Sequence, residues 1–118
     1  MALAIILGAL GAHALEAVLT ENQLTAFETG VRYQVWHCLA IIAIQLFPEN
    51  VLKPSIKNKV STLMLLGILF FSFSIYLLSV KDVIGLGSAG SILGPITPMG
   101  GLLFITAWVL LTVSIIKR

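Results

Sequence analysis

The sequence has few charged residues. Of its 118 residues, 7 are Lys or Arg and 5 are Asp or Glu, which is 10% of the chain, whereas a soluble domain averages about 25%. Hydrophobic residues make up 58%, and the mean hydropathy is +1.07. A soluble fold of this size could not hide so much apolar surface, because small domains bury a limited fraction of their area. We therefore expect one integral membrane domain that covers residues 1–118.

Cysteine and histidine are scarce too, which limits the chemistry. Cys38 is the only cysteine, so neither an intrachain disulfide nor a cysteine-based zinc cluster can form. Two histidines are too few for a convincing zinc site, and the glycine patterns that bind nucleotides are missing. We therefore expect no metal, no cofactor and no catalytic residues in a complete constellation. A net charge of +2 without a basic cluster argues against nucleic-acid binding.

Apolar runs are what the sequence does contain, and they predict an all-α membrane four-helix bundle. The four helices are expected at about residues 2–19, 21–47, 58–80 and 98–116, and the third has the ~20 apolar residues that a span needs. Thr20 and Gln23 have the spacing of a capping box at the start of the second helix. The alternative for that segment is a short interfacial helix that breaks at Gly30.

Basic residues near the ends of these segments predict the orientation. One side of a four-span chain holds five of them and the other side holds two, namely Lys53, Lys57, Lys59, Lys117 and Arg118 against Arg32 and Lys81. Basic residues favour the cytoplasmic side of a membrane. We therefore expect both termini in the cytoplasm (N-in/C-in) and a glycine-rich outer loop at 81–97, before the last helix.

The two histidines are candidate ligand-binding residues, because ionisable groups inside a membrane often mark a site or a polar pathway. His13 lies in a run of small residues, so close helix packing is the alternative interpretation. His37 follows Tyr33 by four residues, which places both side chains on one helical face. The helical rise puts His37 ~15 Å from Phe47, near the middle of the bilayer.

Charged and hydroxyl residues add further candidates. Arg32 can pair with Glu28 one turn earlier and anchor the helix at the interface; the alternative is a guanidinium that binds an anionic lipid or substrate headgroup. Ser72, Tyr76 and Ser79 follow i, i+4, i+7 and form a polar stripe on the third helix. Their hydroxyls would contact another helix, or else line a water path or a ligand.

The stretch GPITPMGG, Gly94–Gly101, precedes the last apolar run. Thr97 and Pro98 match an N-cap followed by proline at the first helical position. Gly100 and Gly101 would leave the first turn without side chains and with free N–H groups that favour anions. Either a neighbouring helix or a bound ligand is expected to fill that space.

Four stretches resemble a known family: LGALGAHAL at Leu7–Leu15, FETGVRYQVWH at Phe27–His37, FSFSIYLLS at Phe71–Ser79 and GPITPMGGLLFITAW at Gly94–Trp108. In this order they are similar to the small bacterial inner-membrane proteins of domain-of-unknown-function family 423, which has similar mitochondrial relatives. The resemblance implies four membrane helices and a multi-pass location in the bacterial cell (inner) membrane. It brings no established reaction, ligand or cofactor. Family members usually have further residues before the first stretch, which the resemblance implies would complete the first span.

These features leave three hypotheses for function. The first is a non-enzymatic protein that binds membrane lipids, a membrane-protein partner or a second copy of itself as a homo-oligomer; it rests on the missing catalytic constellation. The second is a small-molecule or proton transporter or channel, which the histidines and the hydroxyl stripe would serve. The third is a membrane-embedded enzyme in which His13 or His37 acts as acid and base.

Overall fold

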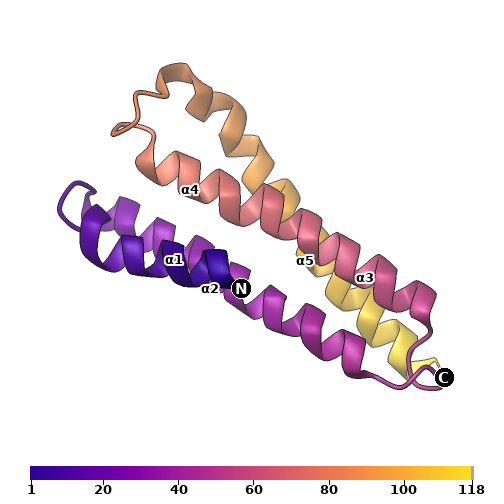
Figure 1. Ribbon diagram of the computed structural model, residues 1–118. Helices are drawn as coiled ribbons and strands as arrows, with labels where there is room; N and C mark the ends of the chain where they lie inside the picture. The colour runs from indigo at the N-terminus through magenta and orange to yellow at the C-terminus, as the bar shows by residue number, and fades with distance from the viewer. Residues whose placement is uncertain (118) are drawn as a thin grey trace.

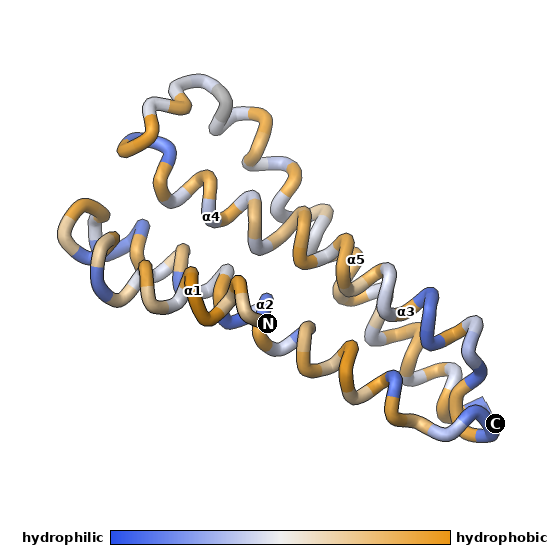
Figure 2. Tube along the Cα trace, viewed as in Figure 1, coloured by the Kyte–Doolittle hydropathy of each residue, from blue (hydrophilic) through white to orange (hydrophobic). Residues whose placement is uncertain are grey.

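Four helical rods make up the computed structural model, which describes residues 1–117 without the side chain of residue 89. The rods run in alternating directions and form an elongated body of 50 × 27 × 17 Å (Figure 1). Its long dimension exceeds the ~30 Å hydrocarbon thickness of a bilayer. Strongly polar residues gather mostly near the two ends of the body, whereas apolar residues dominate along the rods (Figure 2). The all-α prediction is confirmed for the described residues.

The first rod is shorter than predicted. Helix α1 (Ala2–Leu10) continues as the π-helical turn η1 (Gly11–Leu15) and ends there instead of at residue 19. The reason lies in the next helix, because Thr20 is its N-cap and has an extended backbone, with ψ of 159°. The chain must therefore leave the helical conformation before Thr20, and residues 16–19 form the turn.

Helix α2 (Glu21–Leu46) is continuous, which confirms the long helix and rules out a break at Gly30. The predicted capping box is present: the Gln23 backbone N–H donates to Thr20 Oγ1 over 3.3 Å, and the Thr20 backbone N–H donates to Gln23 Oε1 over 2.9 Å. Gly30 is buried against the third rod, where a Cβ atom would lie 2.7 Å from Tyr76 Cε1. The glycine therefore permits a close contact between helices instead of ending one.

The third rod joins α3 (Pro54–Gly67), the π-helical turn η2 (Ile68–Ser72) and α4 (Phe73–Val80). It begins at Pro54, whereas the prediction began at residue 58. Proline fits the first turn of a helix because its missing N–H would have no helical partner there. The polar residues that follow Pro54 are also helical, so the rod extends beyond its apolar segment.

The last rod corrects the prediction for GPITPMGG. Helix α5 (Gly90–Ile116) contains Pro95 and Pro98 in its interior, so Thr97 is not an N-cap and residue 98 is not a helix start. Each proline removes one N–H donor from the helix, and membrane helices tolerate this when neighbouring groups supply other hydrogen bonds. Thr97 Oγ1 lies 2.7 Å from Ser74 Oγ on α4 and so links the two helices.

The glycine-rich loop between α4 and α5 is accordingly shorter than the predicted 81–97. It comprises a turn and the 3-10 helix η3 (Gly87–Ala89) before α5 begins. Gly85 and Gly87 have φ of +67° and +50°, which side-chain-bearing residues rarely adopt. These two glycines therefore reverse the chain between α4 and α5.

Two of the four rods are long and apolar enough to cross a membrane, namely Pro54–Val80 and Gly90–Ile116. The apolar first rod, Ala2–Leu15, is shorter. Arg118, one of the five basic residues in the orientation count, lies outside the described residues. A core near the loop between α2 and α3 joins α2, α3 and α5, and its buried members are Ile44, Leu52, Val60, Met64, Ala107 and Leu111.

Candidate functional site

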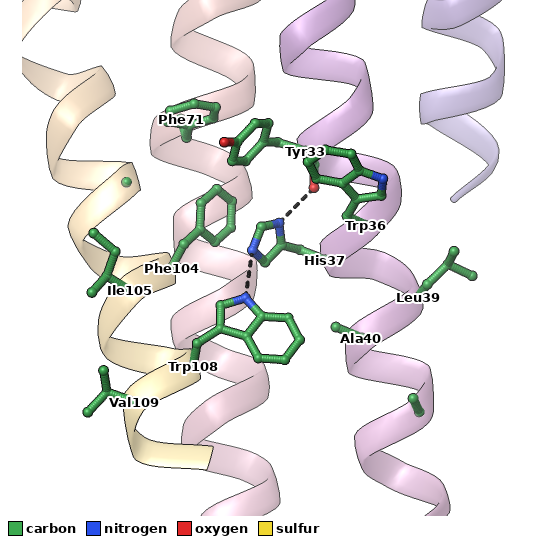
Figure 3. Close-up of a pocket in the computed structure, with 12 residues that line it drawn as sticks. Tyr33, Trp36, His37, Leu39, Ala40, Phe71, Phe104, Ile105, Trp108 and Val109 are labelled. Atoms are coloured by element: carbon green, nitrogen blue, oxygen red, sulfur yellow. Dashed lines mark hydrogen bonds between the residues drawn. The ribbon is translucent and has the colours of Figure 1, made fainter. Parts of the chain in front are cut away.

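A groove with a volume of about 880 Å³ lies between α2 and α5. Phe71 of η2 contributes to its floor, and the side chains of α2 and α5 face each other across it (Figure 3). None of its lining residues is charged. They are Tyr33, Trp36, His37, Leu39, Ala40, Ala43, Phe71, Gly101, Phe104, Ile105, Trp108 and Val109.

His37 lies at the centre of this groove with both ring nitrogens engaged (Figure 3). The Trp108 indole N–H donates to His37 Nε2 over 3.2 Å, and an indole nitrogen can only donate. Nε2 must therefore be the acceptor, which leaves the proton on Nδ1. Nδ1 then donates to the Tyr33 carbonyl oxygen over 2.8 Å. His37 is thus a neutral imidazole, fixed in one tautomer, with no lone pair free for acid–base chemistry.

Aromatic rings hold the walls of the groove in place. The Phe104 ring stacks on His37 with centroids 3.5 Å apart and 13° between the planes. Tyr33 contacts Phe71 with centroids 4.7 Å apart, and Phe71 contacts Phe104 at 5.6 Å. Such ring pairs favour tilted and edge-to-face arrangements and add to the packing energy. The groove is therefore a preformed apolar surface with few rotatable side chains.

The structure brings three of the predicted candidates to this groove: Tyr33, His37 and Gly101. His13 does not join them, because it is exposed on η1 and is not among the residues that line this groove. The two histidines therefore belong to different surfaces. Gly100 is buried against η2, with the space for a Cβ atom taken by the backbone of Phe71. A neighbouring helix, and not a ligand, fills the space beside Gly100.

Glu28 and Arg32 line a smaller groove of about 370 Å³ between α1 and α2. Both side chains are exposed. The ion pair predicted between them is absent, since no Asp or Glu oxygen within residues 1–117 lies within 4.0 Å of the Arg32 guanidinium. Trp36 lines both this groove and the larger one, so the two meet on α2.

The predicted polar stripe on the third rod faces α2. Tyr76 is buried and its hydroxyl donates to Gln34 Oε1 over 2.6 Å. The hydroxyls of Ser72 and Ser79 are buried and have no hydrogen-bond partner among the described residues. Ser79 and Thr97 line a small cavity of about 270 Å³ near the loop between α4 and α5, whereas Ser72 is fully buried. The stripe is therefore mainly a helix contact.

Removing the Tyr76 hydroxyl tests the importance of this contact. We expect Tyr76→Phe to lower the free energy of unfolding by about 1 kcal/mol, because Gln34 Oε1 would be left buried without its donor. Thermal unfolding in detergent would measure the effect. The double variant Gln34→Leu/Tyr76→Phe removes both polar groups and should regain most of the loss; a single variant as stable as the wild type would contradict this assignment.

Sequence reasoning missed five residues that shape these contacts, namely Gln34, Trp36, Phe71, Phe104 and Trp108. A partial signal existed, because Phe104 and Trp108 are four residues apart and share a helical face, as Tyr33 and His37 do. The described residues contain no cluster of three or more His, Cys, Asp or Glu side chains that could bind a metal ion.

Comparisons with known proteins agree with the sequence resemblance. The family model described as "Protein of unknown function (DUF423)" matches residues 7–101. The chain is 36% identical over 115 residues to the UPF0382 membrane protein YwdK of Bacillus subtilis, covering 98% of this chain and 88% of that one. It is 40% identical over 111 residues to the UPF0382 membrane protein SH2409 of Staphylococcus haemolyticus, covering 93% and 83%.

A UPF0382 membrane protein of Haemophilus influenzae is 34% identical over 115 residues, covering 94% of this chain and 82% of that one. No solved structure matches the chain. The family match covers most of the chain, the relatives are named as membrane proteins, and the fold contains several apolar helices. The chain therefore belongs to the DUF423, or UPF0382, family of bacterial membrane proteins.

Proposed function

We propose that this protein is a non-enzymatic lipid-binding membrane protein that holds a hydrocarbon chain in the groove between α2 and α5. One observation carries the proposal: the groove has twelve lining residues, none of them charged, and the polar groups at its centre are bonded to each other. A ligand at that point meets rings and methyl groups. A hydrocarbon chain has the matching chemistry, because it needs no hydrogen-bond partner.

The same contacts support a binding role over the two alternatives. An enzyme that used His37 as acid and base would first have to break its bond to Trp108 or to the Tyr33 carbonyl. A transporter that used the hydroxyl stripe would need a path beside Ser72, which is fully buried. Binding in the groove requires neither rearrangement.

We further propose that all four rods lie in the bacterial cell (inner) membrane with both termini in the cytoplasm. The apolar first rod and α2 pack together beside the two candidate spans, and all four run in alternating directions. The loop between α2 and α3 and the C-terminal end of α5 lie at the same end of the body (Figure 1). In the proposed orientation Lys53, Lys57 and Lys59 would lie on the cytoplasmic side, which basic residues favour.

Filling the groove tests the lipid-binding proposal. Ala43 is exposed on the groove wall, so Ala43→Phe would occupy the groove without disturbing the core. We expect this variant, purified in mild detergent, to retain several-fold less phospholipid than the wild type when bound lipid is counted by native mass spectrometry. The cause is steric, since the new ring takes the place of the chain.

The matched control is Ala14→Phe, which adds the same ring at an exposed position of η1. It should retain lipid like the wild type, and both variants should unfold at the same temperature as the wild type. If Ala43→Phe retained as much lipid as Ala14→Phe, the groove would not be the binding site.

A further inference from the structure

A positively charged side chain, Arg32 of α2, lies near one end of the groove. Arg32, Trp36, Leu39 and Ala43 follow i, i+4, i+7, i+11, so they lie on one helical face. The last three line the groove, and Trp36 also lines the smaller groove that contains Arg32. Arg32 therefore lies one turn before Trp36 and next to Tyr33, at the end of the groove nearer the loop between α4 and α5.

Arg32 also lies deep in relation to the bilayer. His37 stacks on Phe104, which is close to the middle of the spanning helix α5. Five residues separate His37 from Arg32, which corresponds to about 7.5 Å along the helix. Half of the hydrocarbon thickness is ~15 Å, so the Arg32 backbone is inside it. A guanidinium at this depth needs an anion or must extend toward the interface.

The protein itself does not supply that anion. Within residues 1–117 no carboxylate oxygen lies within 4.0 Å of the Arg32 guanidinium. Glu28 is the acidic group nearest along the helix, and it lines the same small groove without forming an ion pair. The Arg32 side chain is exposed and lines the smaller groove, which meets the larger groove at Trp36.

Hydrocarbon contacts cannot select one lipid from another inside a bilayer, because every bilayer lipid carries similar chains. Selection must come from the headgroup. A guanidinium binds phosphate through two parallel hydrogen bonds, and its charge favours a headgroup whose phosphate has no cation of its own over a zwitterionic headgroup. We propose that the groove takes an anionic phospholipid, with one acyl chain between α2 and α5 and the headgroup phosphate on Arg32. This inference rests on the lipid-binding function proposed above and names the lipid class.

The two tryptophans of the chain provide the test, because Trp36 and Trp108 both line the groove. The protein is reconstituted in vesicles of equal parts phosphatidylglycerol and phosphatidylcholine. In one set the phosphatidylglycerol carries dibrominated chains, which quench tryptophan fluorescence, and in the other set the phosphatidylcholine carries them. We expect the wild type to show about a fivefold preference for phosphatidylglycerol, the size of a partly exposed ion pair.

Variants assign this preference to Arg32. Arg32→Gln should lose it, and Arg32→Lys, which keeps the charge without the planar fork, should keep part of it. Lys81→Gln removes the same charge from the outer-loop end and should leave the preference unchanged. A preference that survives Arg32→Gln, or one that Lys81→Gln abolishes equally, would overturn the assignment. If Arg32→Gln fails to fold, equal quenching by the two lipids in the wild type still refutes the proposal.

The remaining outcomes separate the alternatives. Added inorganic phosphate should not reduce the preference; if it did so at millimolar concentration, the site would bind free phosphate instead of a lipid. Weak quenching by both lipids, together with cross-linked dimers, would mean that a second copy covers the groove and would overturn the proposal. Equal quenching with lipid retention that Ala43→Phe still abolishes would refute the choice of lipid and leave chain binding intact.

Discussion

Gly100→Ala is expected to lower the free energy of unfolding by about 3 kcal/mol, at the upper end for overpacking. A Cβ atom at this position would clash with the Phe71 backbone nitrogen and lie 2.8 Å from the Phe70 carbonyl carbon. Both are main-chain atoms of η2, so no side-chain rotation can relieve the clash. Helix α5 would have to move away from η2, and the floor of the groove would move with it.

The neighbouring glycine supplies the control. At Gly101 a Cβ atom would be 3.9 Å from Phe71, an ordinary contact. Gly101→Ala should therefore leave stability unchanged or raise it by up to ~1 kcal/mol, because alanine is the better helix former. Thermal unfolding followed by circular dichroism in detergent would compare the two variants. Equal melting temperatures would show that α5 and η2 are not in close contact in solution.

Local sequence signals predicted the helices well where the physics is local. The capping box of Thr20 and Gln23 correctly predicted the start of α2, whereas the third rod begins at the first-turn proline Pro54, four residues before the predicted start at residue 58. The predicted start of α5 was wrong because we took Pro98 as the first residue of the helix. That preference of proline for the first turn holds where water can satisfy the carbonyl that a proline inside a helix leaves free. In an apolar environment the alternative to a helix with a missing bond is an unsatisfied backbone, which costs more.

The site was predictable only in part, because its geometry depends on how distant helices are aligned. The spacing of Tyr33 and His37 predicted that they share a helical face, and their rings do stack on each other in the structure. Nothing in the spacing could show that Trp108, 71 residues away, would donate to His37. The same limit applies to the bond between Gln34 and Tyr76, which joins helices 42 residues apart. A single sequence gives the faces of each helix, whereas packing decides which faces meet.

The second large effect on stability is expected at Lys57. This residue lies near the start of α3 and is buried, with only 8% of its surface exposed. Its ammonium group donates to the carbonyl oxygens of Gln45 and Phe47 over 3.3 and 2.5 Å. These carbonyls belong to the C-terminal end of α2, where the helix leaves acceptors unpaired and the dipole is negative. Lys57 thus caps α2 from the next rod and joins the two beside the core.

Lys57→Met keeps the length and packing of the side chain and removes only the donors. We expect it to lower the free energy of unfolding by about 2 kcal/mol, because charged hydrogen bonds are lost and two carbonyls stay without a donor. Lys59→Met changes the net charge equally at an exposed position of the same helix and should have little effect. Denaturation by sodium dodecyl sulfate would measure both. If the two variants unfolded alike, the buried ammonium would contribute no more than a surface charge, and the connection between α2 and α3 would depend on the apolar core alone.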